Sequence, residues 1–321
     1  MTDVRRVYYY LVIGAFGGLT GWFVSAVMVR ALGVPKHSLA SLLLYGGILG
    51  AAIGLAVTAY DGLVNRSVSR VFKFGAVGLC LGAFAGALAL PLGDWLWHYI
   101  SPRGAREEMS WQSVLVATLC WIVVGGLIGL GEGISKGTQS WKGLAGGLVG
   151  GLVGGLLHEL TAGGTDGDSF GDQFFLASSL LMLGAAIGMG IAYVTEVLKR
   201  AWFEIRDGKF AGRTYDVTKY VDRALGRHRA GVIGSDQWRA QIYLPGDRDI
   251  CPLHATINFA NGAPTLTVAP EAGGRAATFV NDRRLTASTP LSDGDRLQFG
   301  STRVVYRHKR RRWRARASVS G

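Results

Sequence analysis

Three acidic residues, Asp61, Glu132 and Glu196, each lie near the end of a long apolar stretch of the sequence. Carboxylates inside a membrane often mark the path of an ion or a proton, because burying a charge in hydrocarbon is costly. One hypothesis is that the three acids form a ring guarding an ion path. The other is that they lie at the membrane surface and pair with the basic residues that follow each stretch. Their place at the ends of the stretches favours pairing.

The spacing of other reactive residues does not indicate catalysis or metal binding. The adjacent residues His158 and Glu159 would point to different faces of a helix. The cysteines Cys80, Cys120 and Cys251 indicate no disulfide framework, and a lone cysteine such as Cys251 more commonly packs than reacts. Because the sequence shows no nucleophile paired with a base and no phosphate-cradling loop, we expect a protein that is not an enzyme and uses no metal or cofactor.

The acids belong to six stretches that are apolar and long enough to cross a bilayer, which requires about 20 residues. The chain has 321 residues, a net charge of +12 and 48 glycines, and near Lys199 it changes from apolar to polar. We predict an all-α transmembrane bundle over residues 1–201. Its six helices are expected at 8–31, 42–60, 74–92, 114–130, 141–160 and 174–198.

Glycines recur at every fourth position in these stretches, which places them on about the same helix face. Glycine in a helix costs roughly 1 kcal/mol relative to alanine, but in lipid it lets helix backbones approach closely. We therefore expect helix packing of the glycine-zipper type, and the same faces could also join copies into a homo-oligomer. The packing glycines are Gly46, Gly50, Gly54, Gly78, Gly82, Gly86, Gly125, Gly129, Gly133, Gly143, Gly147, Gly151 and Gly155.

An internal repeat is visible in the same region. The sequence LGAAIG occurs at 49–54 and again at 183–188, and a looser version occupies 125–129. Each copy lies in an even-numbered stretch that ends near an acid. We interpret the region as three copies of a two-helix hairpin, which would be related by an axis along the membrane normal.

Basic residues in the short loops predict the orientation, because such residues accumulate on the cytoplasmic side. We therefore expect a multi-pass protein of the cell (inner) membrane with both termini in the cytoplasm. The cytoplasmic set is Arg5, Arg6, Arg66, Arg70, Lys73, Lys136, Lys142, Lys199 and Arg200, and the opposite set is Arg30, Lys36, Arg103 and Arg106.

Short alternating runs such as 240–244 and 255–259, separated by Gly, Asp, Asn and Pro, follow the apolar region. This spacing is typical of a β-sandwich of about 100 residues, which we place at 202–308. Four pieces then resemble the forkhead-associated (FHA) domain: GVIG at 231–234, CPLHA at 251–255, TFVN at 278–281 and LSDGDRLQFG at 291–300. The resemblance implies an eleven-stranded sandwich that binds phosphothreonine peptides through loops at one end.

Three positions depart from the FHA pattern at the expected phosphate pocket. Ser235 stands where the family has its phosphate-binding arginine, and Cys251 where it has a phosphate-contacting serine. Ala276 stands where the family has the asparagine that holds the peptide. Arginine offers a phosphate dianion a charged, two-pronged donor that serine cannot replace, so simple phosphothreonine binding is not expected.

Other pocket positions keep the pattern. Thr278 retains the family residue, and His254 also matches; in the family this histidine braces the loops from behind. Nearby arginines are either substitutes for the missing phosphate ligand or solvated surface residues. These are Arg239, Arg248 and Arg275.

The chain ends with a basic tail, 309–321, that begins KRRRWRAR. Several cations beside a tryptophan suit the anionic headgroups of a membrane, whereas nucleic acid is a less favoured partner. Our leading hypothesis is a non-enzymatic adaptor that presents an FHA-like domain to a protein or phosphoprotein in signalling by Ser/Thr phosphorylation. The alternative is a transporter or channel regulated by that domain.

Overall fold

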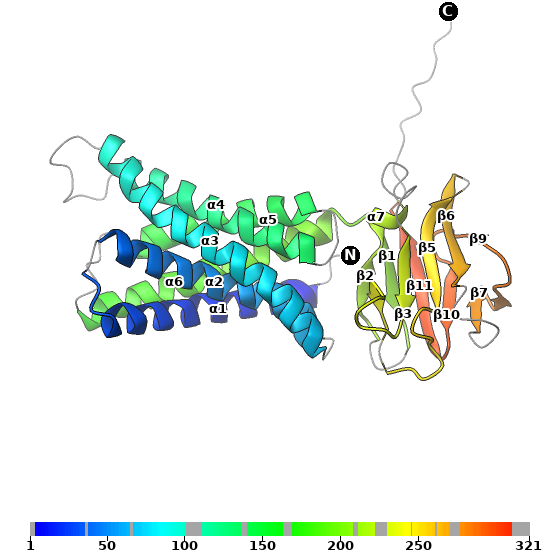
Figure 1. Cartoon of the computed structure of the whole chain (residues 1–321). Coiled ribbons are helices and arrows are strands. Elements are labelled where there is room, and N and C mark those ends of the chain that lie inside the picture. Colours follow the sequence, from blue (N-terminus) through cyan, green and yellow to red (C-terminus); the bar gives the residue numbers. More distant parts are fainter. Residues whose placement is uncertain are drawn as a thin grey trace, which may run out of the picture. The chain divides into compact units, whose positions relative to one another are not determined.

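The computed structural model of the chain describes residues 4–35, 38–64, 67–100, 111–135, 140–162, 169–207, 211–221, 230–244, 246–260, 262–269 and 277–309. The chain divides into two compact units, Met1–Leu198 and Lys199–Gly321. The first unit consists of long helices, and the second is built mainly from strands (Figure 1). This architecture confirms the predicted fold class, a helical bundle followed by a β-sandwich.

Each of the six predicted spans coincides with a long helix that is apolar enough to cross a membrane. The helices have between 23 and 33 residues, which exceeds the length that the hydrocarbon core requires. Their bounds are α1 Val4–Ala31, α2 Leu39–Val64, α3 Val68–Ile100, α4 Trp111–Ser135, α5 Ser140–Ala162 and α6 Phe170–Val197.

The six helices form a closed ring in which each contacts the next along the chain and α1 contacts α6. The even-numbered helices supply most of the large buried apolar side chains, including Ile53 of α2, Ile128 of α4 and Ile187 of α6. The buried positions of α1 and α5 are mostly glycines. Bulky residues on one helix therefore face small residues on its neighbours.

Glycines lie against the backbone of the neighbouring helix at most contacts of the ring. A methyl group added to Gly50 of α2 would overlap the carbonyl oxygen of Gly82 of α3, and one added to Gly129 of α4 would overlap that of Gly143 of α5. A third pair, Gly14 of α1 and Gly184 of α6, closes the ring in the same way. The sequence analysis did not single out this third pair. Within one chain, these glycine faces are occupied by neighbouring helices.

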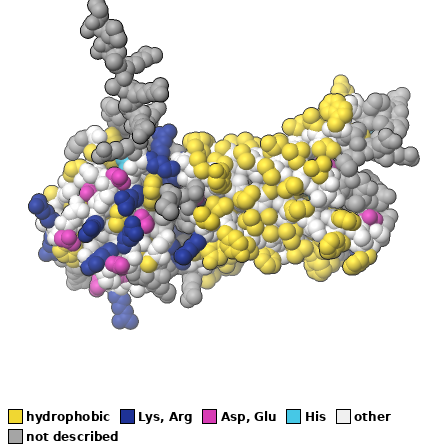
Figure 2. All heavy atoms as spheres, turned by 180° about the vertical axis from the view of Figure 1, so that it is seen from behind, with side chains coloured by type: hydrophobic (Ala, Val, Ile, Leu, Met, Phe, Trp, Pro, Cys, Tyr) yellow, Lys and Arg dark blue, Asp and Glu magenta, His cyan; other side chains and the backbone are white. Residues whose placement is uncertain are grey.

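The remaining predicted packing glycines lie in equivalent places. Gly46 and Gly54 of α2 face α3, and Gly151 and Gly155 of α5 face Trp121 of α4. The outer surface of the bundle is covered with apolar side chains (Figure 2). A continuous apolar surface of this size marks a membrane or a protein interface.

Eleven described strands and one short helix build the second unit. One sheet has the order β2-β1-β11-β10-β7-β8, and the other has the order β4-β3-β5-β6-β9. All pairs are antiparallel except the parallel pair β3 and β4. The bounds are β1 Ala201–Ile205, β2 Thr214–Asp216, α7 Thr218–Val221, β3 Gly231–Gly234, β4 Ile242–Tyr243, β5 Ala255–Ala260, β6 Ala263–Val268, β7 Thr278–Val280, β8 Arg283–Arg284, β9 Thr289–Pro290, β10 Arg296–Phe299 and β11 Thr302–His308.

Large side chains fill the space between the two sheets. Phe203 of β1 packs edge-on against Phe299 of β10, with ring centroids 6.5 Å apart, and against Tyr306 of β11 at 5.9 Å. From the other sheet, Ile257 and Leu266 are completely buried against this cluster. Burial of one such side chain contributes roughly 1.5 to 3 kcal/mol, so the sandwich has a core of its own.

Candidate functional site

Ser235, which we expect at the position of the family arginine, follows β3 directly. Its hydroxyl donates a hydrogen bond of 2.9 Å to the carbonyl oxygen of Ile250, and its backbone N–H donates to the carbonyl of Cys251 at 3.1 Å. The half-buried serine therefore joins the β3–β4 loop to the β4–β5 loop. A serine bonded in this way offers no charge to a phosphate group.

His254 lies completely buried behind these loops, at the start of β5. Its Nδ1 accepts a hydrogen bond of 3.2 Å from the backbone N–H of Cys251, and its ring lies edge-on to Phe299 at 5.7 Å. Burial lowers the pKa of His254, which favours the neutral imidazole that an accepting Nδ1 requires. The histidine holds the turn that carries Cys251, whose side chain is half-buried.

Thr278 is completely buried at the start of β7. It pairs with Phe299 across the sheet, and its carbonyl accepts a hydrogen bond from Leu285. The structure therefore places His254 and Thr278 in the interior, whereas Ser235 and Cys251 are half-buried. Arg275 and Ala276 lie outside the described residues.

The β3–β4 loop presents an exposed tryptophan that the sequence analysis did not single out. The Asp236 carboxylate accepts hydrogen bonds from the backbone N–H groups of Trp238 at 2.7 Å and Arg239 at 3.2 Å, which fixes a tight turn. Trp238 is 63% exposed, and it is the only large hydrophobic side chain that is exposed among the described residues beyond Leu198. The sequence signal that could have revealed this exposed residue was a tryptophan within the polar run SDQWRA.

Arg239 and Arg248 are both exposed on loops that follow β3 and β4. Between them in sequence, the Asp247 carboxylate accepts hydrogen bonds from the Ser301 backbone at 2.9 Å, the Ser301 hydroxyl at 2.8 Å and the Thr302 hydroxyl at 2.9 Å. Burial alone would raise the pKa of Asp247, but these bonds outweigh it and the pKa is lowered. The carboxylate ties the β4–β5 loop to the β10–β11 turn.

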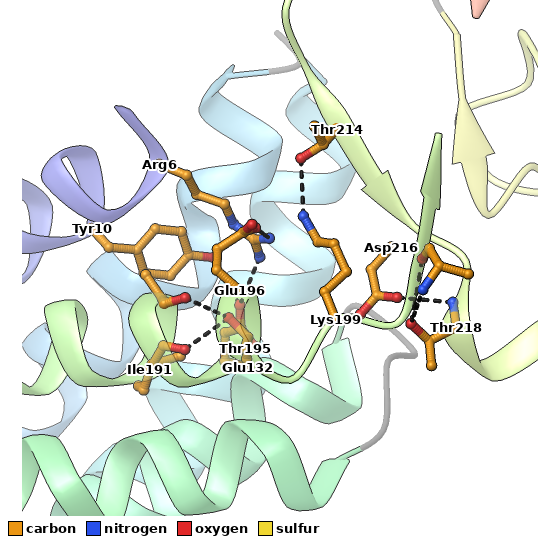
Figure 3. Close-up of polar contacts among 12 residues, drawn as sticks. Arg6, Tyr10, Glu132, Ile191, Thr195, Glu196, Lys199, Thr214, Asp216 and Thr218 are labelled. Atoms are coloured by element: carbon orange, nitrogen blue, oxygen red, sulfur yellow. Dashed lines mark hydrogen bonds and ion pairs between the residues drawn. The ribbon is translucent and has the colours of Figure 1, made fainter. Parts of the chain in front are cut away.

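The acids of the bundle meet around one arginine from the first helix. Arg6 Nη1 donates to Glu196 Oε1 at 2.7 Å, and Arg6 Nη2 lies 3.9 Å from Glu132 Oε1 (Figure 3). The Tyr10 hydroxyl donates to Glu132 Oε1 at 2.7 Å, and Asp61 interacts electrostatically with Arg6 and Glu132. The structure therefore brings together the three acids that the sequence singled out.

In this network, Arg6 and Tyr10 contact the carboxylates of Glu132 and Glu196. Glu132 and Glu196 are only 1% and 5% exposed, and a buried carboxylate needs a charged partner because water cannot stabilise it. The pairing hypothesis had placed the partners among basic residues after each span; the structure adds Arg6, on α1. The loop residues Arg66, Lys136, Arg103 and Arg106 lie outside the described residues.

A second polar group lies near the C-terminal end of α5 and includes His158 and Glu159. His158 Nδ1 is 2.9 Å from the Ser179 hydroxyl, and its ring lies edge-on to Trp121 at 5.3 Å. Glu159 Oε1 is 3.9 Å from His158 Nε2. Within the described ranges, no three His, Cys, Asp or Glu residues are grouped in a way that could hold a metal ion.

Comparison with protein-family models matches residues 226–300 to the FHA domain family. No curated protein matches the chain. Among solved structures, an FHA domain studied for its phosphothreonine-dependent interactions is 24% identical, with a TM-score of 0.28, and covers 35% of this chain and 99% of its own.

Two further solved structures are similar over the same region. The FHA domain of FhaA, solved in complex with the intracellular domain of Rv3910, is 25% identical, has a TM-score of 0.26 and covers 33% of this chain and 99% of its own. The FHA domain of CT664 from Chlamydia trachomatis is 20% identical, has a TM-score of 0.29 and covers 35% of this chain and 99% of its own. The family match at residues 226–300 falls within the sandwich of two sheets and shows that this part of the chain is similar to FHA domains.

Proposed function

We propose that the protein is a non-enzymatic adaptor that anchors an FHA domain at the cytoplasmic face of a membrane, where the domain binds a protein partner. The observation that carries the proposal is the FHA match at 226–300 in a chain that also holds six helices able to cross a bilayer. Residues 1–201 would be the anchor, 202–308 the recognition domain and 309–321 a basic tail. The tail, apart from Lys309, lies outside the described residues.

The partner belongs to Ser/Thr-phosphorylation signalling, but the phosphate itself contributes less to recognition than in other FHA domains. Ser235 replaces the arginine fork, and its hydroxyl is already bonded to Ile250. The exposed Trp238 and Arg239 on the same loop are of the residue types that dominate protein interfaces. We therefore place the main contacts on the β3–β4 loop.

The adaptor proposal is tested with the full chain in detergent and two matched peptide arrays, one with threonine and one with phosphothreonine. We expect a defined set of peptides to bind, with only a small gain from the phosphate. Trp238→Ala should abolish binding, whereas Thr256→Ala, on the outer face of β5, should leave it unchanged. Failure to bind any peptide in either array would contradict the proposal.

The alternative of a transporter or channel receives less support. An ion path requires carboxylates that can exchange partners with the ion, and Arg6 is already bonded to Glu196 and lies close to Glu132. The network also joins α1, α4 and α6, which are far apart in sequence. We therefore assign Glu132, Glu196 and Asp61 a structural role, which the flux measurement in the Discussion tests.

A further inference from the structure

The two outer faces of the FHA sandwich differ sharply in charge. None of the five described strands β3, β4, β5, β6 and β9 contains a charged residue. The strands of the other sheet contain five arginines and two acids, Glu204 and Asp216. Such an asymmetry within one small domain indicates that one face meets an anionic partner.

Strand alternation turns four of these arginines to the same side. In β11, Val304 and Tyr306 are buried, so Arg303 and Arg307 point away from the core; in β10, the buried Leu297 and Phe299 leave Arg296 facing outward. Arg284 of β8 is exposed beside Phe279. We call the outward side chains Arg284, Arg296, Arg303 and Arg307 the basic face.

Acids and aromatic rings accompany the basic face. Glu204 Oε2 lies 3.9 Å from Arg307 Nε, and Asp207 Oδ2 lies 3.6 Å from Arg303 Nη1, but exposed pairs of this kind hold each other weakly. Trp202 pairs in register with Arg307, and the Lys309 ammonium lies 5.9 Å from the Trp202 ring. Tryptophan beside arginine and lysine is typical of side chains at a membrane–water interface.

The chain itself limits how far this sheet can move from the helices. Only Leu198, Lys199 and Arg200 separate the end of α6 from the start of β1, a strand of the basic sheet. Three extended residues span about 10 Å, and charges interact over about 8 Å at physiological salt. The start of β1, and with it Arg307 opposite Trp202, therefore stays close to a membrane that holds α6.

We propose that the basic face docks on the anionic headgroups of the membrane in which the protein is anchored. The inference rests on the anchoring proposed above and concerns a surface separate from the loops that carry Trp238. Attraction between the arginines and anionic lipid would hold the sheet against the bilayer. Docking of this kind would fix the direction in which the peptide-binding loops face.

The test uses the full chain, reconstituted in nanodiscs, with one fluorescent label. Cys80, Cys120 and Cys251, which are free, are first replaced by alanine. Gln298→Cys then places the label on the basic face, and Thr256→Cys places it on the uncharged face as the matched control. A quencher attached to lipid headgroups reports which face lies at the membrane surface.

Docking predicts strong quenching at position 298 and weak quenching at position 256 in discs that contain phosphatidylglycerol. Discs of phosphatidylcholine alone, or high salt, should remove most of the quenching at 298 without any substitution. Replacing the four arginines of the basic face by glutamine should do the same. Equal quenching at the two positions, or quenching that does not change with the charge of the lipid, would overturn the inference.

Two other outcomes are distinguishable. A chain that fails to enter the discs would contradict membrane anchoring itself, and with it the docking that depends on anchoring. Strong quenching at 298 in discs without anionic lipid that is lost when single-stranded nucleic acid is added would reassign the basic face to nucleic acid and overturn the lipid assignment.

Discussion

The helical bundle and the FHA sandwich achieve close packing by opposite means. In the bundle, backbones meet where side chains are missing, as at Gly50 against Gly82 and Gly14 against Gly184. In the sandwich, the contact is made by large side chains such as Phe203, Phe299 and Tyr306. One chain therefore contains two kinds of core.

The difference is the one expected for a bundle that lies in lipid and a sandwich that lies in water. In water, burying apolar surface drives folding, so large side chains are favoured in the core. In lipid, the surroundings are as apolar as the core, so association depends on van der Waals contact and on polar bonds between helices. Glycine provides the close contact in the bundle, and the Arg6 network provides the polar bonds.

The largest expected effect is on the aromatic core of the sandwich. Phe299→Ala should destabilise the FHA domain by about 3–5 kcal/mol, because it leaves a cavity between the two sheets. Hydrogen exchange on the full chain should show faster exchange in the strands and unchanged exchange in the helices. Phe279→Ala, on the outer face of the same sheet, is the control and should cost far less. Comparable losses in helices and strands would show that the two cores are not separate.

The second largest effect is expected from the loss of the charged network in the bundle. Arg6→Gln should destabilise the bundle by about 3 kcal/mol, because it leaves buried carboxylates without their cation. Thermal unfolding in detergent measures this, and the neighbouring exposed Arg5→Gln should have little effect. Glu132→Gln in liposomes should show no change in ion flux. A stable Arg6→Gln variant, or flux that depends on Glu132, would favour an ion path instead.

Glycine packing gives a third prediction, with two glycines of one helix as a matched pair. Gly50→Ala should destabilise the bundle by about 2 kcal/mol, because its methyl group would overlap the Gly82 carbonyl. Gly47→Ala places the methyl group 3.4 Å from the Ala87 side chain, an ordinary contact, and should be neutral or slightly stabilising. Equal thermal shifts for the two variants would contradict packing by glycine.

Much of the division of the chain into a helical bundle and a β-sandwich could be predicted from the sequence. Apolar stretches predict the six helices and glycines four apart predict close helix packing, because the rules of helix periodicity are local. Which helices pack against each other, such as α2 against α3 and α4 against α5, required the fold. The alternation around 255–259 similarly predicts β5. The closing contact of Gly14 with Gly184 was missed, since it joins the first helix to the last and depends on the whole arrangement.

The site was less predictable than the fold. The sequence singled out Ser235 and His254, but it did not show that the Ser235 hydroxyl is bonded to Ile250. Nor did it show Arg6 between Glu132 and Glu196, which come from helices more than 100 residues away in the chain. Contacts between distant segments require the fold, whereas spans and strands require only local pattern.

A fourth, smaller effect concerns phosphate recognition. Ser235→Arg should raise affinity for a phosphothreonine peptide about tenfold, because a charged hydrogen bond to phosphate contributes about 1.5 kcal/mol or more. Isothermal titration with the full chain in detergent measures the gain, and the unphosphorylated peptide is the control. An equal gain for both peptides would show that the arginine does not reach a phosphate.

The smallest effect is the response of the sandwich to acid. The lowered pKa of Asp247 means that its hydrogen bonds stabilise the fold above the ordinary aspartate pKa of about 3.9 and are lost as the pH falls below it. Unfolding temperatures measured across this range should fall more steeply for the unaltered chain than for Asp247→Asn. If the unfolding temperatures of the two chains fell equally with pH, the Asp247 carboxylate would not contribute to stability.

Protease treatment of inverted membrane vesicles shows whether the helices hold the strand-rich unit on the cytoplasmic side of a membrane. If helices α1 to α6 anchor an FHA domain on the cytoplasmic side, protease added to inverted vesicles should release a soluble fragment containing 201–309. The helices should remain in the membrane pellet after an alkaline wash, and sealed right-side-out vesicles should release nothing. Recovery of the uncut chain in the soluble fraction, or release of the fragment from right-side-out vesicles alone, would contradict a cytoplasmic domain anchored by six helices.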